Sequence, residues 1–135
     1  MQRPPMRFSG PVLGSSDPAA LAEFYSRLLG WPITDRETGG PNGWAMIRSP
    51  TVRLKLEFQY EPHFVPPVWP PVAGEQQMLI HLDIGVQDLD AGVAWAVGAG
   101  ATVAEHQPQE DVRVLRDPSG HLFCLFADEL VPDEL

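Results

Sequence analysis

The sequence is poor in cysteine and in long apolar runs. Its 135 residues include one cysteine, Cys124. A single cysteine excludes an internal disulfide and a zinc site built only from cysteines, and it is typical of a reducing compartment. No apolar stretch approaches the ~20 residues of a membrane span, and residues 1–5 lack the apolar core of a signal peptide. We therefore expect a cytoplasmic protein.

Basic residues are also scarce. Nine lysines and arginines stand against eighteen acidic residues, which gives a net charge of −9 and an isoelectric point near 4.7. Nucleic acids and anionic membranes attract positive surfaces, so this balance argues against both as partners. It leaves cationic and neutral small molecules open. Proline, in contrast, is abundant, with fifteen in all, and the segment 60–77 is especially rich in it.

Two segments carry matching helix signals. The first helix is predicted to begin after Asp17 and to end at Gly30, and the second to begin after Asp88 and to end at Gly100. Apolar residues recur at helical spacing in both. They are Leu21, Phe24, Tyr25 and Leu28 in the first helix, and Leu89, Val93, Ala96 and Val97 in the second.

One strand is predicted before each helix and three after it. In the first half the strands are 7–14, 31–37, 44–49 and 52–59, with a turn at 39–43. In the second half they are 78–86, 102–107, 111–116 and 121–126, with a turn at 117–120. The two halves thus repeat after about 70 residues, and the proline-rich crossover 60–77 joins them. Neither half could bury both faces of its sheet alone.

Several short motifs occur in a characteristic order. They are Asp-Pro-Ala-Ala-Leu-Ala-Glu-Phe-Tyr at 17–25, Leu-Leu-Gly-Trp at 28–31, Phe-Gln at 58–59, the Pro/Trp-rich 66–71, His-Leu-Asp at 81–83, Gly-Ala-Gly-Ala at 98–101 and Asp-Pro-Ser-Gly-His at 117–121. In this order the chain resembles the vicinal oxygen chelate superfamily, which comprises glyoxalases, bleomycin-resistance proteins and extradiol dioxygenases.

The resemblance implies a single α+β domain over residues 1–135. It consists of two βαβββ repeats, about 6–59 and 78–128, whose curved mixed sheets enclose a shared cavity and carry their helices on the outer faces.

The resemblance also implies where a metal would bind, because metal-dependent members hold the ion with one residue from the first and one from the last strand of each repeat. His81 matches one ligand position, and Gly10 occupies another without a side chain. Cys124 stands where the family usually has glutamate. The fourth position is Leu56 by turn matching, or Glu57 by the parity of the polar face. His81 and Glu57 are therefore the expected ligands of a divalent ion such as zinc, nickel, manganese or iron, in an incomplete set.

The other candidate residues allow two interpretations each. His81 and Asp83 share one face of a strand, as a ligand with its orienting carboxylate, as a general base, or as a structural pair. Glu57 acts with His81 in acid–base chemistry or, like Gln59, is simply solvated. Asp83, Gln59, Trp69 and Cys124 are predicted to bind substrate. Cys124 could instead be a small core residue, and Trp69 could plug the crossover.

Two functions follow from the resemblance. The first is a binding protein of the bleomycin-resistance type, a homodimer that holds and sequesters a small cationic or aromatic molecule such as an antibiotic. The depleted ligand set and the acidic composition favour it. The alternative is a divalent-metal-dependent enzyme, namely a lyase, an isomerase or a dioxygenase, in which His81 and Glu57 perform the chemistry.

Overall fold

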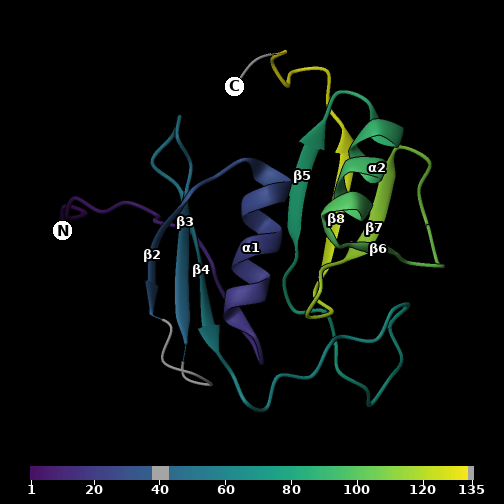
Figure 1. Cartoon of the computed structure of the whole chain (residues 1–135), viewed down its shortest axis with the longest axis horizontal. Helices are drawn as coiled ribbons and strands as arrows, with labels where there is room; N and C mark the ends of the chain where they lie inside the picture. The colour runs from purple at the N-terminus through teal and green to yellow at the C-terminus, as the bar shows by residue number, and fades with distance from the viewer. Residues whose placement is uncertain (38–42, 134–135) are drawn as a thin grey trace. The chain divides into compact units, whose positions relative to one another are not determined.

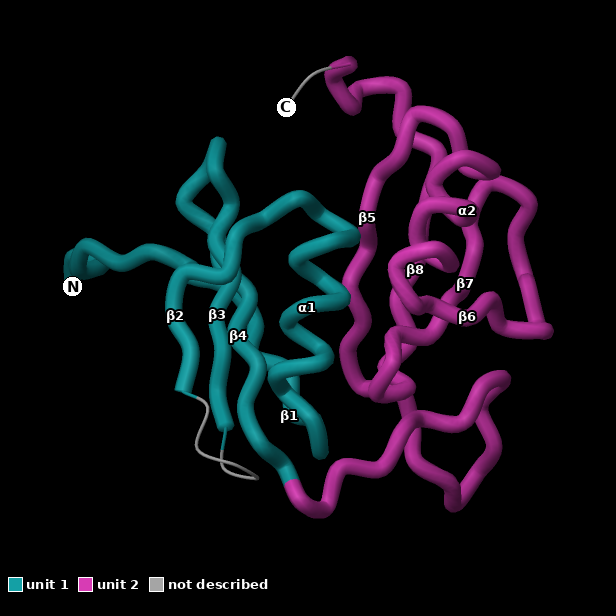
Figure 2. The backbone as a smooth tube through the Cα atoms, viewed as in Figure 1, with its two compact units in different colours: residues 1–61 teal, residues 62–135 magenta. Residues whose placement is uncertain are grey.

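The computed structural model describes residues 1–37 and 43–133. The chain divides into two compact units, Met1–Glu61 and Pro62–Leu135 (Figure 2). The turn predicted at 39–43 falls almost wholly on residues 38–42, outside the described part. No helix of the described residues is long and apolar enough to cross a membrane.

The first unit is a four-stranded mixed sheet with one helix. Its elements are β1 (Val12–Ser15), α1 (Pro18–Leu29), β2 (Ile33–Glu37), β3 (Trp44–Arg48) and β4 (Lys55–Tyr60) (Figure 1). The strands lie in the order β1-β4-β3-β2. β1 runs parallel to β4, and the other two pairs are antiparallel. A parallel neighbour needs a long connection, and this is the path through α1, β2 and β3.

The second unit repeats this arrangement. Its elements are β5 (Leu82–Val86), α2 (Leu89–Ala99), β6 (Thr102–Val103), β7 (Val112–Arg116) and β8 (Leu122–Ala127). The strand order β5-β8-β7-β6 corresponds strand for strand to the first sheet. β5 is again parallel to the last strand, β8. The predicted α+β class and the two βαβββ units are therefore confirmed.

Matching caps begin and end the two helices. Asp17 accepts a hydrogen bond from the backbone N–H of Ala20 at 3.1 Å, and Asp88 accepts one from Ala91 at 3.0 Å. Each bond satisfies a donor that the first helical turn leaves unpaired. Gly30, at φ +70°, ends α1 in the left-handed conformation, which favours glycine. The predicted helix boundaries are thus confirmed.

The core of the first unit lies between α1 and one face of its sheet. Phe24 and Tyr25 are fully buried, as are Ile47 and Phe58. The rings of Tyr25 and Phe58 stack with their centroids 5.7 Å apart. Since residues alternate along a strand, Phe58 and Leu56 lie toward the helix, and their neighbours on β4 face the opposite side of the sheet.

The core of the second unit lies under α2 and differs from the predicted stripe. Ala96 and Ala99 are buried, whereas Val97 is 47% exposed, so the prediction for Val97 was wrong. A Cβ added to Gly92 would lie 3.0 Å from the side chain of Val86, which shows how closely the helix approaches β5. Small residues allow this approach, and they turn the helix so that the buried line passes through Ala99 rather than Val97.

Several strands are shorter than predicted, because a ladder extends only as far as its neighbour. The strand predicted at 7–14 is Val12–Ser15, and that predicted at 52–59 is Lys55–Tyr60. Before β4, Leu54 N–H bonds to Val52 C=O in a tight turn, so residues 52–54 have left the ladder. The strand predicted at 78–86 begins only at Leu82, which pairs with Phe123. His81 therefore directly precedes β5 rather than lying within it.

The strand predicted at 102–107 is reduced to the two residues of β6. A side chain replaces the missing ladder. The amide of Gln107 donates to the C=O of Ala104 at 2.8 Å and of Val114 at 2.9 Å. Its oxygen accepts from the N–H of Val114 at 2.8 Å. The amide group thus satisfies backbone groups that a longer strand would have paired.

Candidate functional site

The candidate site is the face of the second sheet that α2 does not cover. Asp83 on β5 is the register partner of Cys124 on β8, and Cys124 is in turn opposite Val114 on β7. Partners in register lie on the same face, so Asp83, Cys124 and Phe126 all face away from the helix. A pocket of about 320 Å³ lies on this face. Its lining residues are His81, Asp83, Gln109, Asp111, Val112, Cys124, Phe126 and Ala127, and we call it the His81 pocket.

His81 and Asp83 form the closest polar pair of this pocket. His81 Nε2 lies 3.0 Å from Asp83 Oδ1, and the two side chains are 34% and 61% exposed. The spacing of two residues predicted that they would share a face, and the distance bears this out. A carboxylate at one ring nitrogen fixes the orientation of the imidazole.

Cys124 completes a group of three. Partial burial, and then the nearby Asp83 carboxylate, raise the pKa of its thiol above the ordinary value. The free thiol is therefore a weak nucleophile at neutral pH. One ligand atom from each of His81, Asp83 and Cys124 lies within 4.8 Å of the other two.

This group can hold a divalent ion. Imidazole nitrogen, carboxylate oxygen and thiolate sulfur are the donors that zinc and related borderline ions accept. Three protein ligands leave a position for a substrate oxygen. A bound cation would favour the thiolate, which burial and Asp83 disfavour in its absence. Asp83, predicted as a substrate-binding residue, thus belongs to the candidate metal group together with His81.

Glu57 and Gln59 lie in the first unit, on the face of β4 opposite α1. Leu56 is 4% exposed on the helix side, so of the two residues considered for the family's ligand position only Glu57 is on the open face. Glu57 Oε2 lies 2.7 Å from Lys55 Nζ, and both side chains are less than one-fifth exposed. The carboxylate therefore already has a cationic partner. That Glu57 acts with His81 stays a prediction.

Trp69 lies outside the lining of the His81 pocket. Its indole Nε1 donates to the C=O of His106 at 2.9 Å, and the two rings are 5.8 Å apart. These contacts attach the crossover to the segment after β6. The prediction that Trp69 binds substrate is not tested by them.

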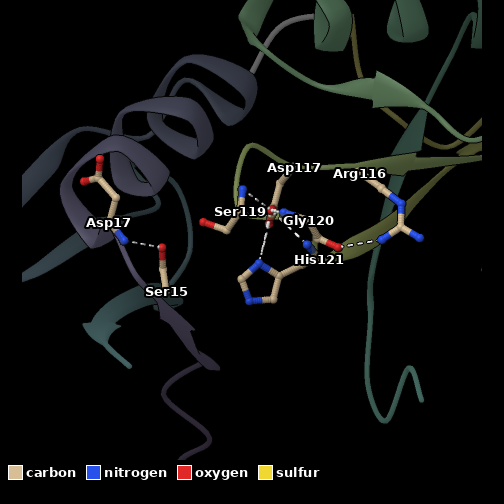
Figure 3. A network of polar contacts seen from close by, with 7 residues as sticks. All are labelled: Ser15, Asp17, Arg116, Asp117, Ser119, Gly120 and His121. Carbon is tan, nitrogen blue, oxygen red and sulfur yellow. Dashed lines mark hydrogen bonds and ion pairs between the residues drawn. The ribbon is translucent and has the colours of Figure 1, made fainter. Parts of the chain in front are cut away.

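A second polar network, around Asp117, exceeds what the sequence indicated. Asp117 Oδ1 accepts three hydrogen bonds of 3.0 Å from the N–H groups of Ser119, Gly120 and His121. His121 Nδ1 lies 2.9 Å from Asp117 Oδ2 (Figure 3). The sequence predicted the turn at 117–120 and a capping or solvent-facing role for His121. It did not predict that the His121 ring packs on Phe64, with centroids 4.4 Å apart.

Three lining residues of the His81 pocket were not predicted either. Phe126 could have been found, because it is two residues beyond Cys124 and therefore on the same face. Gln109 and Asp111 precede β7 in a loop, and no periodicity in the sequence indicates where such residues lie.

The architecture and the pocket on an open sheet face define a class of small ligand-binding proteins and metalloenzymes. Residues 12–126 match the family model of the glyoxalase-like domain. The chain belongs to this family.

Solved structures share the fold at low sequence identity. TnmS3, an antibiotic binding protein from Streptomyces sp. CB03234, is 17% identical, with a TM-score of 0.61 over 93% of this chain and 98% of that one. The fosfomycin resistance protein FosX from Listeria monocytogenes, complexed with Mn(II) and 1S,2S-dihydroxypropylphosphonic acid, is 13% identical, with a TM-score of 0.66 over 92% and 91%. A glyoxalase/bleomycin resistance protein from Albidiferax ferrireducens T118 is 23% identical, with a TM-score of 0.56 over 88% and 96%. No curated protein matches the chain.

Proposed function

We propose that this protein binds a small organic cation with an aromatic or apolar part in the His81 pocket. The observation that carries the proposal is the charge of the lining. It includes the carboxylates of Asp83 and Asp111 and the ring of Phe126, and neither lysine nor arginine is among the described residues that form it. Carboxylates attract a cation, and an aromatic face adds a cation–π contact. A volume of about 320 Å³ is at the lower end of the range of ligand sites.

The role that we propose is sequestration of such a molecule, for example an antibiotic. The fold similarity to the antibiotic-binding protein TnmS3 supports this choice. The acidic composition of the whole chain, with a net charge of −9, adds long-range attraction for a cation.

Calorimetry with a matched series of ligands tests the proposal. Benzyltrimethylammonium, benzyl alcohol and benzoate share one ring and differ in charge. We expect the cation to bind most tightly and benzoate least. Asp83→Asn and Asp111→Asn should each weaken binding of the cation about two- to fivefold, the scale of a partly exposed ion pair, and should leave benzyl alcohol unaffected. Equal binding of cation and anion would contradict the proposal.

Glu105→Gln is the matched control. Glu105 is exposed and lies outside the pocket lining. Its replacement changes the net charge by the same amount, so it should leave the affinity for the cation unchanged.

A second candidate function is a divalent-metal-dependent lyase, isomerase or dioxygenase. The observation in its favour is the approach of His81, Asp83 and Cys124 to within 4.8 Å. The fold similarity to FosX, whose structure contains Mn(II), supports it as well. A bound ion would polarise a substrate oxygen, and His81 and Glu57 are the residues that we propose for proton transfer.

Metal analysis separates the two functions. For the enzyme we expect near-stoichiometric zinc, nickel, manganese or iron in protein purified without chelator, and loss of the ion in His81→Ala. With Co(II) as the probe, a thiolate-to-cobalt charge-transfer band should appear and should disappear in Cys124→Ser. Metal-free protein that also fails to take up Co(II) would refute the metal-dependent function and leave ligand binding as the proposal.

We further propose that the protein acts as a homodimer, as is common in this family. Light scattering coupled to size-exclusion chromatography should give twice the 14.9 kDa of the chain. Trp95, which is 60% exposed on α2, is the residue that we propose at the subunit contact. Trp95→Ala should then shift the mass toward the monomer.

A further inference from the structure

A second pocket, of about 140 Å³, lies between the crossover and the start of β8. Its lining includes Phe64, Gln76, Gln77, Met78, His121 and Leu122, and it has no lining residue in common with the His81 pocket. Apart from His121, none of the described residues that form it is ionisable. We call it the His121 pocket.

The histidine in this pocket is held in one orientation by a buried carboxylate. The Asp117 side chain has no exposed surface, and its Oδ2 lies 2.9 Å from His121 Nδ1. A carboxylate can only accept a hydrogen bond, so the proton of the neutral imidazole is on Nδ1. The other ring nitrogen, Nε2, is then left with a lone pair.

That nitrogen is available to a ligand. In Figure 3 it is directed away from Asp117. Among residues 1–37 and 43–133, none forms a hydrogen bond with it. The ring is only 16% exposed, because it packs on Phe64 with the two planes tilted by 30°. A buried acceptor without a partner is costly, so a ligand with a donor would be stabilised there.

The wall of the pocket is fixed to the turn that carries His121. Arg116 Nη1 donates to the C=O of Pro67 in the crossover at 2.8 Å and to the C=O of Gly120 at 2.9 Å. These bonds to a charged group hold the crossover against the turn. A pocket that is already formed loses less conformational entropy when a ligand binds.

The two glutamines of the lining also offer acceptors rather than donors. The NH₂ group of Gln76 donates to the C=O of Gln77 at 3.0 Å. The NH₂ group of Gln77 donates to the C=O groups of Val72 and Glu75. With these donors in use, a ligand meets the lone pair of His121 Nε2 and the amide oxygens. The pocket is therefore suited to a molecule that donates.

We propose that the His121 pocket is a second ligand site, for a neutral compact molecule that has one aromatic ring and one hydroxyl or N–H donor. The ring would lie against Phe64 and Met78, and the donor would bond to His121 Nε2. The size is appropriate, since a protein cavity of about 150 Å³ is large enough for benzene. This proposal does not depend on the function of the His81 pocket.

Phenol and toluene are the probes, because they share a ring and only phenol donates. Each is titrated into full-length protein with ¹³C- and ¹⁵N-labelled histidine, and the four histidine ring signals are followed by NMR. We expect saturable shifts of the His121 signals, with dissociation constants on the order of millimolar for ligands of this size. Phenol should bind about fivefold more tightly than toluene, the effect of one hydrogen bond, and should shift His121 Nε2.

His121→Asn is the informative variant. The asparagine amide can still donate to Asp117, in the place of Nδ1, but nothing replaces Nε2. We expect phenol and toluene to bind equally weakly to it. His106→Asn is the matched control, because His106 lies outside the lining and contacts Trp69 instead. This variant should keep the preference for phenol.

Three results would overturn the proposal. They are equal binding of the two probes to the native protein, shifts confined to His81, or shifts that increase linearly without saturation. Should His121→Asn fail to fold, the ¹⁵N shift of Nε2 in the native protein decides alone. It must move on addition of phenol and stay unchanged on addition of toluene.

Discussion

Replacing Gly120 by alanine should destabilise the second unit through two separable effects. Gly120 has φ +97°, a conformation that residues with a side chain rarely adopt. A Cβ at this position would also lie 2.8 Å from Pro66 Cβ and 3.0 Å from Pro66 Cγ. Real Cβ atoms do not approach other carbons so closely, so the crossover or the turn must move.

The magnitude follows from adding the two effects. The backbone conformation costs an alanine about 1–2 kcal/mol, and overpacking against a rigid proline costs about 1–3 kcal/mol more. The smaller entropy of the unfolded alanine variant returns roughly 0.5–1 kcal/mol. We therefore expect Gly120→Ala to lower the free energy of unfolding by about 2–4 kcal/mol.

Two other glycines separate the effects. Gly30 has φ +70° and no atom within 4 Å of an added Cβ, so Gly30→Ala reports the backbone strain alone. Gly98 lies within α2, where an added Cβ also has open space. Gly98→Ala should stabilise the protein by about 0.5–1 kcal/mol, because alanine is the better helix former.

Urea denaturation followed by circular dichroism measures all three variants at a common m value. The difference between Gly120→Ala and Gly30→Ala isolates the contact with Pro66. If the two variants lose the same stability within about 0.5 kcal/mol, the crossover moves aside freely and the reasoning is wrong. In that case the wall of the His121 pocket is not fixed either.

The remaining predictions concern the pocket thiol, the core and the caps. Asp83→Asn should accelerate alkylation of Cys124 by iodoacetamide at a fixed pH below the ordinary thiol pKa, because one of the two causes that raise the pKa is removed; mass spectrometry gives the rate, and an unchanged rate would mean that burial alone sets it. Phe58→Ala should cost about 3–5 kcal/mol in urea denaturation, as expected for a fully buried ring. Asp17→Ala and Asp88→Ala should each cost about 1 kcal/mol in the same assay, since each removes one capping bond, and a neutral result at either position would show that water replaces the cap.

The helix ends could be predicted because their chemistry is local. An aspartate that caps the first turn and a glycine that closes the last one act within a few residues of each other. The strand ends depend on distant partners. Nothing near residues 78–81 in the sequence indicates that the ladder with β8 starts only at Leu82. Nor does the sequence show that the Gln107 side chain replaces a strand partner.

The site was predictable to a similar extent. The period of two residues along a strand placed His81 beside Asp83, and the polar parity of β4 placed Glu57 rather than Leu56 on the open face. The proximity of Asp83 to Cys124 required the register of β5 against β8, which is a tertiary property. The contact of His121 with Phe64 joins segments 57 residues apart, with only proline-rich chain and loops around one of them.

The crossover belongs to one unit and not to a neutral linker. Arg116 and Trp69 tie it to the second unit at the C=O groups of Pro67 and His106, and the boundary between the units falls before it, after Glu61. The two repeats are thus alike in topology but unequal in content. For anyone who divides the gene to express the halves separately, the codon of Pro62 is the place to cut, because a fragment that starts at residue 78 would lose a wall of its own pocket.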